Sequence, residues 1–118
     1  MKINDAIKTL SGVQEAHQND PLMLFNWSKG QEENIGAIGK DQINGWEGPT
    51  IRHDVYGLTI KEMLNYLESL PLSIRQQPLM VFNVATGKPE EAKTISPFDD
   101  EKPLSDDNRL SISYADED

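Results

Sequence analysis

The sequence has only two histidines with which to perform acid–base or metal chemistry, His17 and His53. His53 stands next to Asp54 in the segment TIRHDVY, and an imidazole beside a carboxylate can transfer protons or bind a metal. Alternation in the same segment groups His53 with Ile51 and Val55, which is typical of a half-buried histidine in a strand. Neither HExxH nor Gly-x-Ser-x-Gly occurs. A metal-dependent enzyme using His53 and Asp54 is therefore an alternative, and the main prediction is no catalytic residue, no metal and no cofactor.

Two further segments contain the residue types of known sites without the surrounding pattern. Glu91, Ala92 and Lys93 have the E-x-K form of metal-dependent nucleases, which also need an acid on a neighbouring strand. No acid occurs anywhere in 69–89. The glycines of GKDQINGWEG are not followed by Lys-Ser/Thr, so a phosphate-binding loop is not indicated. Because the chain also lacks cysteine, thiolate catalysis is excluded, and we predict that the protein is not an enzyme.

Acidic residues dominate the charge of the chain. Twenty Asp and Glu residues stand against eleven Lys and Arg residues, which gives a net charge of −9 at pH 7. This excludes nucleic-acid binding by phosphate neutralisation, because that mode needs a basic surface. The excess is concentrated in 88–118, with ten acids against four basic residues. We expect the partner to be another protein with a basic surface, with no direct nucleic-acid binding and no membrane.

Two segments carry the residues that we expect to contact this partner. The segment 39–48 is interpreted as a flexible loop that presents Trp46 as a binding anchor, with a tryptophan folded back onto the sheet as the equal alternative. The second segment is rich in acids, which are either simply solvated, or bind Ca²⁺, or imitate nucleic-acid phosphates in a basic groove. The missing D-x-D-x-D-G pattern disfavours Ca²⁺. The predicted partner-binding residues are Trp46, Asp99, Asp100, Glu101, Asp106 and Asp107.

An internal repeat organises the chain. A shift of 57 residues places DPLMLFNWSKG (20–30) on QPLMVFNVATG (77–87) without a gap, and it also pairs Ile3 with Ile60. The sequence therefore predicts a single domain over 1–118, built from two repeats at about 1–57 and 58–118. Residues 115–118 are predicted to form a disordered acidic tail.

Each repeat begins with a predicted amphipathic helix. Apolar residues recur at helical spacing in 60–70 and in 3–13. Thr59, followed three residues later by Glu62, forms a capping box at the start of the second helix. Lys2 stands at the corresponding place in the first repeat, so we expect the first helix to lack this cap and to be shorter or more frayed.

Apolar runs after each helix predict the strands. The runs 22–27 and 79–84 are apolar on both faces and indicate central strands. Long loops are predicted at corresponding places of the two repeats, 39–50 and 96–108. The predicted fold is α+β, with two tandem helix–strand–strand repeats related by pseudo-two-fold symmetry and the helices packed on one face of a sheet. Weaker strand candidates are 35–38, 51–56, 92–95 and 109–114.

The hydropathy pattern offers no membrane segment. No apolar run approaches the roughly 20 residues that a membrane-spanning helix needs. Asp5 and a helical pattern occupy the N-terminal segment where a signal peptide would need an uncharged stretch. We therefore predict a cytoplasmic protein.

The segment LTIKEMLNYLESLP (58–71), followed by PLMVFN (78–83), resembles a T-[IV]-x-E-[LM] helix-then-strand module of small uncharacterised phage and prophage proteins. The first repeat departs from this module, because it lacks the threonine cap and the Leu-Pro ending. The resemblance implies a small phage-type protein that binds other proteins, and it implies no catalytic residues.

The sequence hypothesis is thus a non-enzymatic acidic protein-binding module, encoded by a phage or mobile element, that inhibits or redirects a host protein. An anti-defence inhibitor or a nucleic-acid mimic would be one instance. The alternative is a structural or assembly protein that acts as a homo-oligomer, with a homodimer as the simplest form. In that alternative, 109–114 is an edge strand that pairs with its copy.

Overall fold

The computed structural model describes residues 1–118 apart from 27–29, 44–45, 54–56, 84–86, 98 and 115–118. It contains helices and a mixed arrangement of strands, so the predicted α+β class is confirmed. The acidic tail predicted at 115–118 lies outside the described residues.

Two nine-residue helices form where the apolar stripes predict them, α1 (Ile3–Ser11) and α2 (Ile60–Glu68). Each is followed by a short helical turn, η1 (Glu15–His17) after the first and α3 (Leu72–Arg75) after the second. Of the expectation that α1 would be shorter or more frayed, the first part is wrong, since the two helices have equal length. The buried residues of the two stripes are Ile3, Ala6, Leu10, Ile60, Met63 and Leu67.

The N-termini of the two helices differ as the sequence predicts. At α2, Thr59 Oγ1 accepts the Glu62 N–H at 3.1 Å and Glu62 Oε1 accepts the Thr59 N–H at 3.1 Å. At α1, Lys2 carries no side-chain acceptor. Only the reciprocal bond is present there, from the Lys2 N–H to Asp5 Oδ2 at 3.2 Å. Burial of the apolar stripe, more than capping, therefore sets the length of α1.

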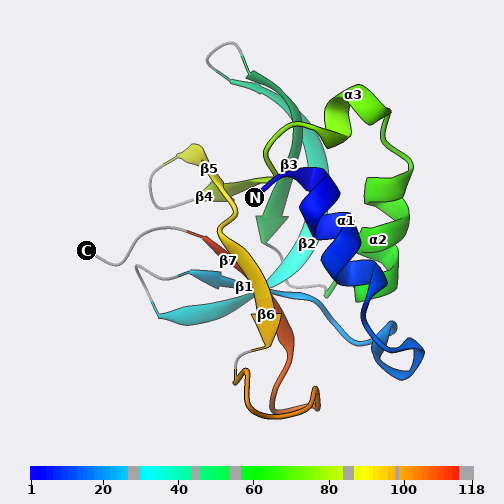
Figure 1. Ribbon diagram of the computed structural model, residues 1–118. Helices are drawn as coiled ribbons and strands as arrows, with labels where there is room; N and C mark the ends of the chain where they lie inside the picture. The colour runs from blue at the N-terminus through cyan, green and yellow to red at the C-terminus, as the bar shows by residue number, and fades with distance from the viewer. Residues whose placement is uncertain (27–29, 44–45, 54–56, 84–86, 98, 115–118) are drawn as a thin grey trace.

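The described structure contains seven strands, and their hydrogen-bonded order is β5-β4-β3-β2-β1-β7-β6 (Figure 1). The β1–β7 and β3–β4 pairs are parallel, and the other pairs are antiparallel. It follows that β1, β3, β4 and β7 all run in one direction. The strands are β1 (Met23–Asn26), β2 (Gln31–Ile43), β3 (Trp46–His53), β4 (Met80–Asn83), β5 (Lys88–Glu91), β6 (Thr94–Pro97) and β7 (Leu110–Tyr114).

The strands form two sheets that are joined at two places. One join is the long strand β2, which belongs to both sheets, and the other is the step from β5 to β6. Up to Asn34, β2 pairs with β1, and β7 and β6 extend that sheet. From Ile35 onward, β2 pairs with β3, with a bulge between Ile35 and Ala37, and β4 and β5 extend the other sheet. At the far margin the chain steps from β5 to β6 through Ala92 and Lys93. The Ala92 N–H bonds the Leu79 carbonyl on one side, and the Lys93 N–H bonds the Ser113 carbonyl on the other.

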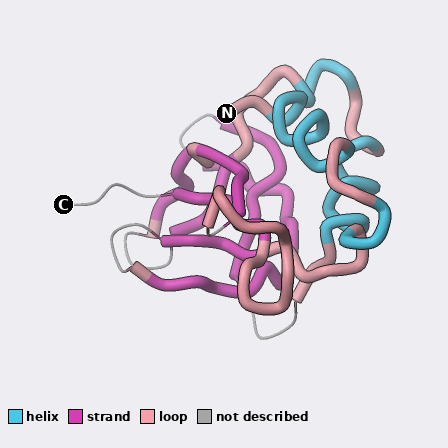
Figure 2. The backbone as a smooth tube through the Cα atoms, turned by 60° about the horizontal axis from the view of Figure 1, so that its bottom comes forward, coloured by secondary structure: helices cyan, strands magenta, loops and turns pink. Residues whose placement is uncertain are grey.

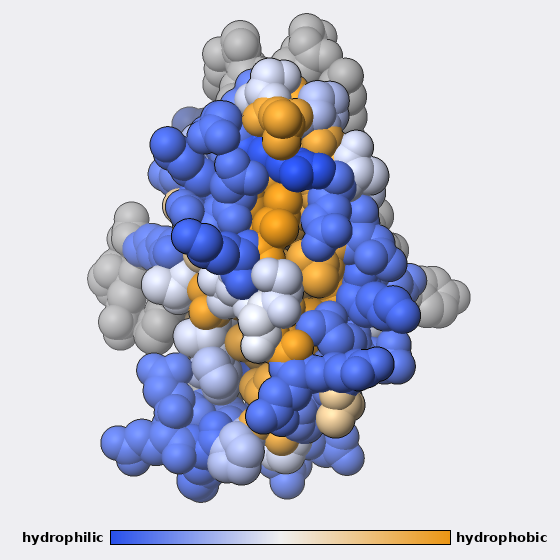
Figure 3. Space-filling view, turned by 45° about the vertical axis from the view of Figure 1, so that its right-hand side comes forward, coloured by the Kyte–Doolittle hydropathy of each residue, from blue (hydrophilic) through white to orange (hydrophobic). Residues whose placement is uncertain are grey.

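One core fills the space between the strands and the helices. Figure 2 shows the helices gathered on one side of the strands. Figure 3 shows an apolar stripe between hydrophilic flanks on the side that carries the helices. Helix residues that are partly buried against the core include Ile7 and Leu64. The strand residues of this core include Leu24, Ile51, Val81, Ile95, Leu110, Ile112 and Tyr114.

Three strand predictions need correction. The segment 39–50 is not a long loop, because it belongs almost entirely to the antiparallel hairpin of β2 and β3. The segment 109–114 is not an edge strand, because β7 is paired with β1 on one side and with β6 on the other. The candidate at 92–95 straddles the step between β5 and β6, and β5 itself was not predicted.

Corresponding elements of the two halves begin 57 residues apart, which holds for α1 and α2, β1 and β4, and β2 and β5. The glycines that directly precede β2 and β5 correspond as well. Gly30 and Gly87 have φ of 62° and 69°, a left-handed conformation that glycine adopts without steric cost. Each donates its N–H to the carbonyl of the strand-end asparagine, Asn26 or Asn83, at 2.8 Å.

We predict that Thr59→Ala lowers the free energy of unfolding by about 1 kcal/mol, because the first turn of α2 loses its side-chain acceptor. Lys2→Ala is the matched control at the same position of α1, and it is expected to change stability by less than about 0.5 kcal/mol. Urea unfolding followed by circular dichroism measures both variants. Equal losses for the two would show that the capping box does not stabilise α2.

Candidate functional site

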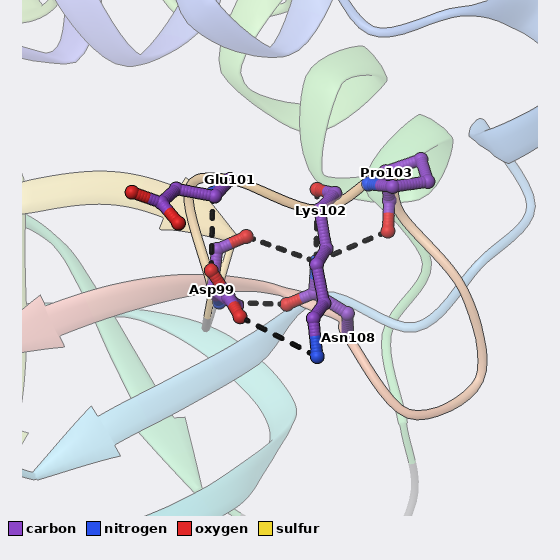
Figure 4. A network of polar contacts seen from close by, with 5 residues as sticks. All are labelled: Asp99, Glu101, Lys102, Pro103 and Asn108. Atoms are coloured by element: carbon purple, nitrogen blue, oxygen red, sulfur yellow. Dashed lines mark hydrogen bonds and ion pairs between the residues drawn. The ribbon is translucent and has the colours of Figure 1, made fainter.

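The side chain of Asn108 forms hydrogen bonds with the backbone of the acidic loop, which comprises residues 99–108 (Figure 4). Asn108 Oδ1 accepts the Asp99 N–H at 2.7 Å, and Asn108 Nδ2 donates to the Asp99 carbonyl at 3.1 Å. The carbonyl oxygens of Lys102 and Pro103 lie 3.1 Å and 3.0 Å from the same nitrogen, so its two hydrogens are shared among three carbonyls. Asn108 is 5% exposed, and Leu104 packs against the core beneath the loop. The loop is therefore built into the fold at two points.

The predicted acids of this loop fall into two kinds. Asp99 is half-buried and belongs to the framework of the loop, because its Oδ1 accepts the Glu101 N–H at 3.0 Å and its Oδ2 lies 3.8 Å from Lys102 Nζ. The other four predicted acids are exposed. They are Asp100, Glu101, Asp106 and Asp107. The structure thus brings four carboxylates to the surface of one ordered loop.

Trp46 is not part of this surface. It is the first residue of β3 and stands opposite Ile43 in the hairpin, so the expected flexible loop around it is wrong. Figure 1 shows the hairpin of β2 and β3 at the top of the molecule and the loop between β6 and β7 at the bottom. The predicted partner-binding residues therefore form two groups that the structure does not bring together.

A polar cluster that the sequence patterns did not predict lies where the parallel strands end. It comprises Asn26, Glu33, Asn83, Glu90 and Tyr114. Asn26 and Tyr114 are register partners on β1 and β7, and Glu33 is the partner of Leu24, so these three side chains share one face of their sheet. The Tyr114 hydroxyl donates to the Glu33 carboxylate, and Asn83 Nδ2 donates to Glu90 Oε2 at 3.3 Å.

The cluster changes the acid–base properties of Tyr114. Burial raises the pKa of the Tyr114 hydroxyl far above its usual range, and the hydrogen bond to Glu33 and the charges of Glu33 and Glu90 raise this pKa further. A hydrogen bond with Asn26 acts in the opposite direction and is the smaller effect. Tyr114 is therefore a neutral donor throughout the physiological pH range. The hydrogen bond between Tyr114 and Glu33 joins the second half of the chain to the first at this cluster.

The two histidines lie on different elements of the described structure. His17 Nδ1 lies 2.8 Å from Asp20 Oδ2 in the turn after α1. His53 ends β3, paired in register with Ile35, and Asp54 lies outside the described residues. Within the described ranges, no three His, Cys, Asp or Glu side chains are grouped so that they could hold a metal ion.

Comparison with known proteins gives no relative from which a function could be transferred. No family model, no curated protein and no solved structure matches the chain. Among the described residues, no helix is long and apolar enough to cross a membrane.

We predict that Tyr114→Phe lowers the free energy of unfolding at pH 7 by about 1–3 kcal/mol, because Glu33 loses a buried hydrogen-bond donor. The loss should shrink above about pH 10. There the unfolded wild-type chain releases the Tyr114 proton while the folded chain retains it, so wild-type stability falls as pH rises. Urea unfolding from pH 7 to pH 11 measures this dependence.

Tyr66→Phe, at a half-buried position on α2, is the control for loss of a tyrosine hydroxyl elsewhere. It should keep the alkaline slope of the wild type. If Tyr114→Phe kept that slope as well, the burial and hydrogen bonding assigned to Tyr114 would be wrong.

Proposed function

We propose that this chain is a non-enzymatic protein-binding module that presents its acidic loop to a basic surface of another protein. The observation that carries this proposal is the four exposed carboxylates on a loop whose backbone is fixed by Asn108. A loop that is already ordered loses little conformational freedom on binding, so more of the interaction energy appears as affinity.

Charge supports the same proposal. The chain carries a net charge of −9. A negatively charged protein associates faster with a positively charged surface, because electrostatic attraction steers the two together. The polar cluster offers no comparable contact surface, because Asn26, Asn83 and Tyr114 are each no more than 2% exposed. The acidic loop is therefore the better candidate for the binding site.

The chemistry of the partner follows from the loop. Carboxylates held at fixed positions can occupy a groove that normally takes nucleic-acid phosphates, so the favoured partner is a protein with a nucleic-acid-binding groove. Inhibition or redirection of a host protein by a phage or mobile element is the setting that the helix–strand resemblance suggests. The absence of cysteine fits a reducing compartment, and we expect the interaction to take place in the cytoplasm.

The matched spacing of the elements supports a pseudo-two-fold relation between the halves. Under this relation the acidic loop between β6 and β7 corresponds to the tip of the β2–β3 hairpin. The acidic loop and the tip of the β2–β3 hairpin then occupy equivalent positions in the two halves. The acidic loop carries the predicted acids. Trp46 at the other position provides a second, separate contact in this proposal.

The test begins by capturing partners of the tagged protein from a lysate of its native host and measuring the affinity of the purified partner. Asp100→Asn, Asp106→Asn and Asp107→Asn together should weaken binding by at least about tenfold, mostly through slower association. The matched control neutralises three exposed acids elsewhere, Glu15→Gln, Glu32→Gln and Glu68→Gln, and should retain affinity. If the two sets of variants weakened binding equally, net charge alone would account for the loss of affinity, and a binding site specific to the loop would be contradicted.

A second variant separates the order of the loop from its charge. Asn108→Ala keeps every carboxylate and removes the side chain that holds the backbone of the loop. We expect weaker binding with folding otherwise intact by circular dichroism. Unchanged affinity would show that the ordered conformation is not what the partner recognises.

A further inference from the structure

Neither half of the chain completes its own sheet. In the first half, β1 pairs with its own β2 on one side, and the other side is filled by β7 from the second half. In the second half, β4 pairs with its own β5 on one side, and the other side is filled by β3 from the first half. Each half thus supplies its last strand to the first strand of the other.

Backbone hydrogen bonds outside the strands also connect the two halves, with donors from each half. The Leu22 N–H bonds the Leu58 carbonyl and the Leu79 N–H bonds the Met1 carbonyl, each at 2.9 Å. The Ile3 N–H bonds the Gln77 carbonyl and the Ile60 N–H bonds the Asp20 carbonyl, each at 3.0 Å. All four bonds join the first half of the chain to the second.

Completion within one chain requires a long-range encounter. Met23 pairs with Ser111, 88 positions away, whereas the Ser96–Ser111 pair within the second half spans only 15 positions. Long loops are the more costly to close, and distant strand pairing is slow. During that delay the second half of another copy offers the same strand, with the same contacts.

We propose that a second copy of this chain is a partner, and that two molecules exchange halves. Residues 1–53 of one copy then fold with residues 58–114 of the other, and each of the two resulting folds contains every contact between halves described above. The covalent link between the halves passes from one fold to the other. The exchanged dimer carries two acidic loops, so it can bind a repetitive target with avidity that the monomer lacks.

The sequence permits a direct test because it contains no cysteine. Met23→Cys with Ser111→Cys places two thiols on register partners from different halves. Ser96→Cys with Ser111→Cys is the matched control, since these register partners both belong to the second half. Ser111 Oγ has no hydrogen-bond partner among the described residues, so its replacement breaks no described bond.

Both double variants and the wild type are unfolded, refolded at about 10 μM and about 1 mM, and examined by light scattering. The variants are then oxidised and run on a non-reducing denaturing gel. We expect a dimer fraction that rises with concentration in all three proteins. The Met23/Ser111 dimer should stay covalent on the gel, and the Ser96/Ser111 dimer should separate into single chains.

Two outcomes would overturn the proposal. One is a dimer whose Met23/Ser111 disulfides all lie within single chains, because such a dimer associates without exchanging halves. The other is a wild-type chain that scatters as a monomer at both concentrations. This second readout requires no substitution, so it stands even if a cysteine variant fails to fold.

Discussion

The parallel pairing of β1 with β7 is the interaction on which the other features of this structure depend. It joins residues 23–26 of the first half to residues 111–114 of the second through four register pairs, from Met23–Ser111 to Asn26–Tyr114. With β7 in place, Ile112 lies beside Leu24 in the core. The same pairing makes Tyr114 a neighbour of Asn26 and Glu33, and it fixes the strand that directly follows the acidic loop. The core, the polar cluster and the candidate binding loop are thus consequences of one strand pairing.

The fold separates the functions of its charged and apolar residues. Full burial of each large apolar side chain contributes roughly 1.5–3 kcal/mol before the entropy of ordering is subtracted, and these side chains come from both halves. The acids are placed where they do not oppose this burial. Four predicted acids are exposed on the loop, and the more buried Glu33 receives the Tyr114 hydroxyl. A chain with a net charge of −9 can therefore fold around an apolar centre and still present negative charge to a partner.

Local sequence patterns predicted what depends on local residues. The apolar stripes indicated α1 and α2, the Thr59–Glu62 pair indicated the capping box, and alternation in 109–114 indicated β7. The β2–β3 hairpin was missed although Asn44 and Gly45 between the strands are a strong two-residue hairpin signal. β5 was missed because Lys88–Glu91 reads KPEE, which has none of the residues that favour strands.

The sequence patterns could not predict the non-local features, and the reason is physical. Strand order and the internal position of β7, between β1 and β6, arise from pairing between residues far apart in the chain, and no local period encodes that pairing. Asn26 and Asn83 were interpreted only as turn residues, although the 57-residue shift that pairs them also pairs Glu33 with Glu90. That correspondence was the available signal for the polar cluster. Four acids of the predicted loop are exposed in the structure, while the role of Asn108 in holding the loop was visible only in the structure.

Native-state hydrogen exchange tests most directly whether the two halves depend on each other. The amide protons of Leu22 and Leu79 bond carbonyls of the opposite half, and each lies at the entrance to a central strand. If the halves complete one another, both amides should exchange only through opening of the whole fold, with the same free energy and the same dependence on urea. If one of the two exchanged at a much lower free energy while the other stayed protected, one half would be stable alone, and the mutual dependence of the halves would be contradicted.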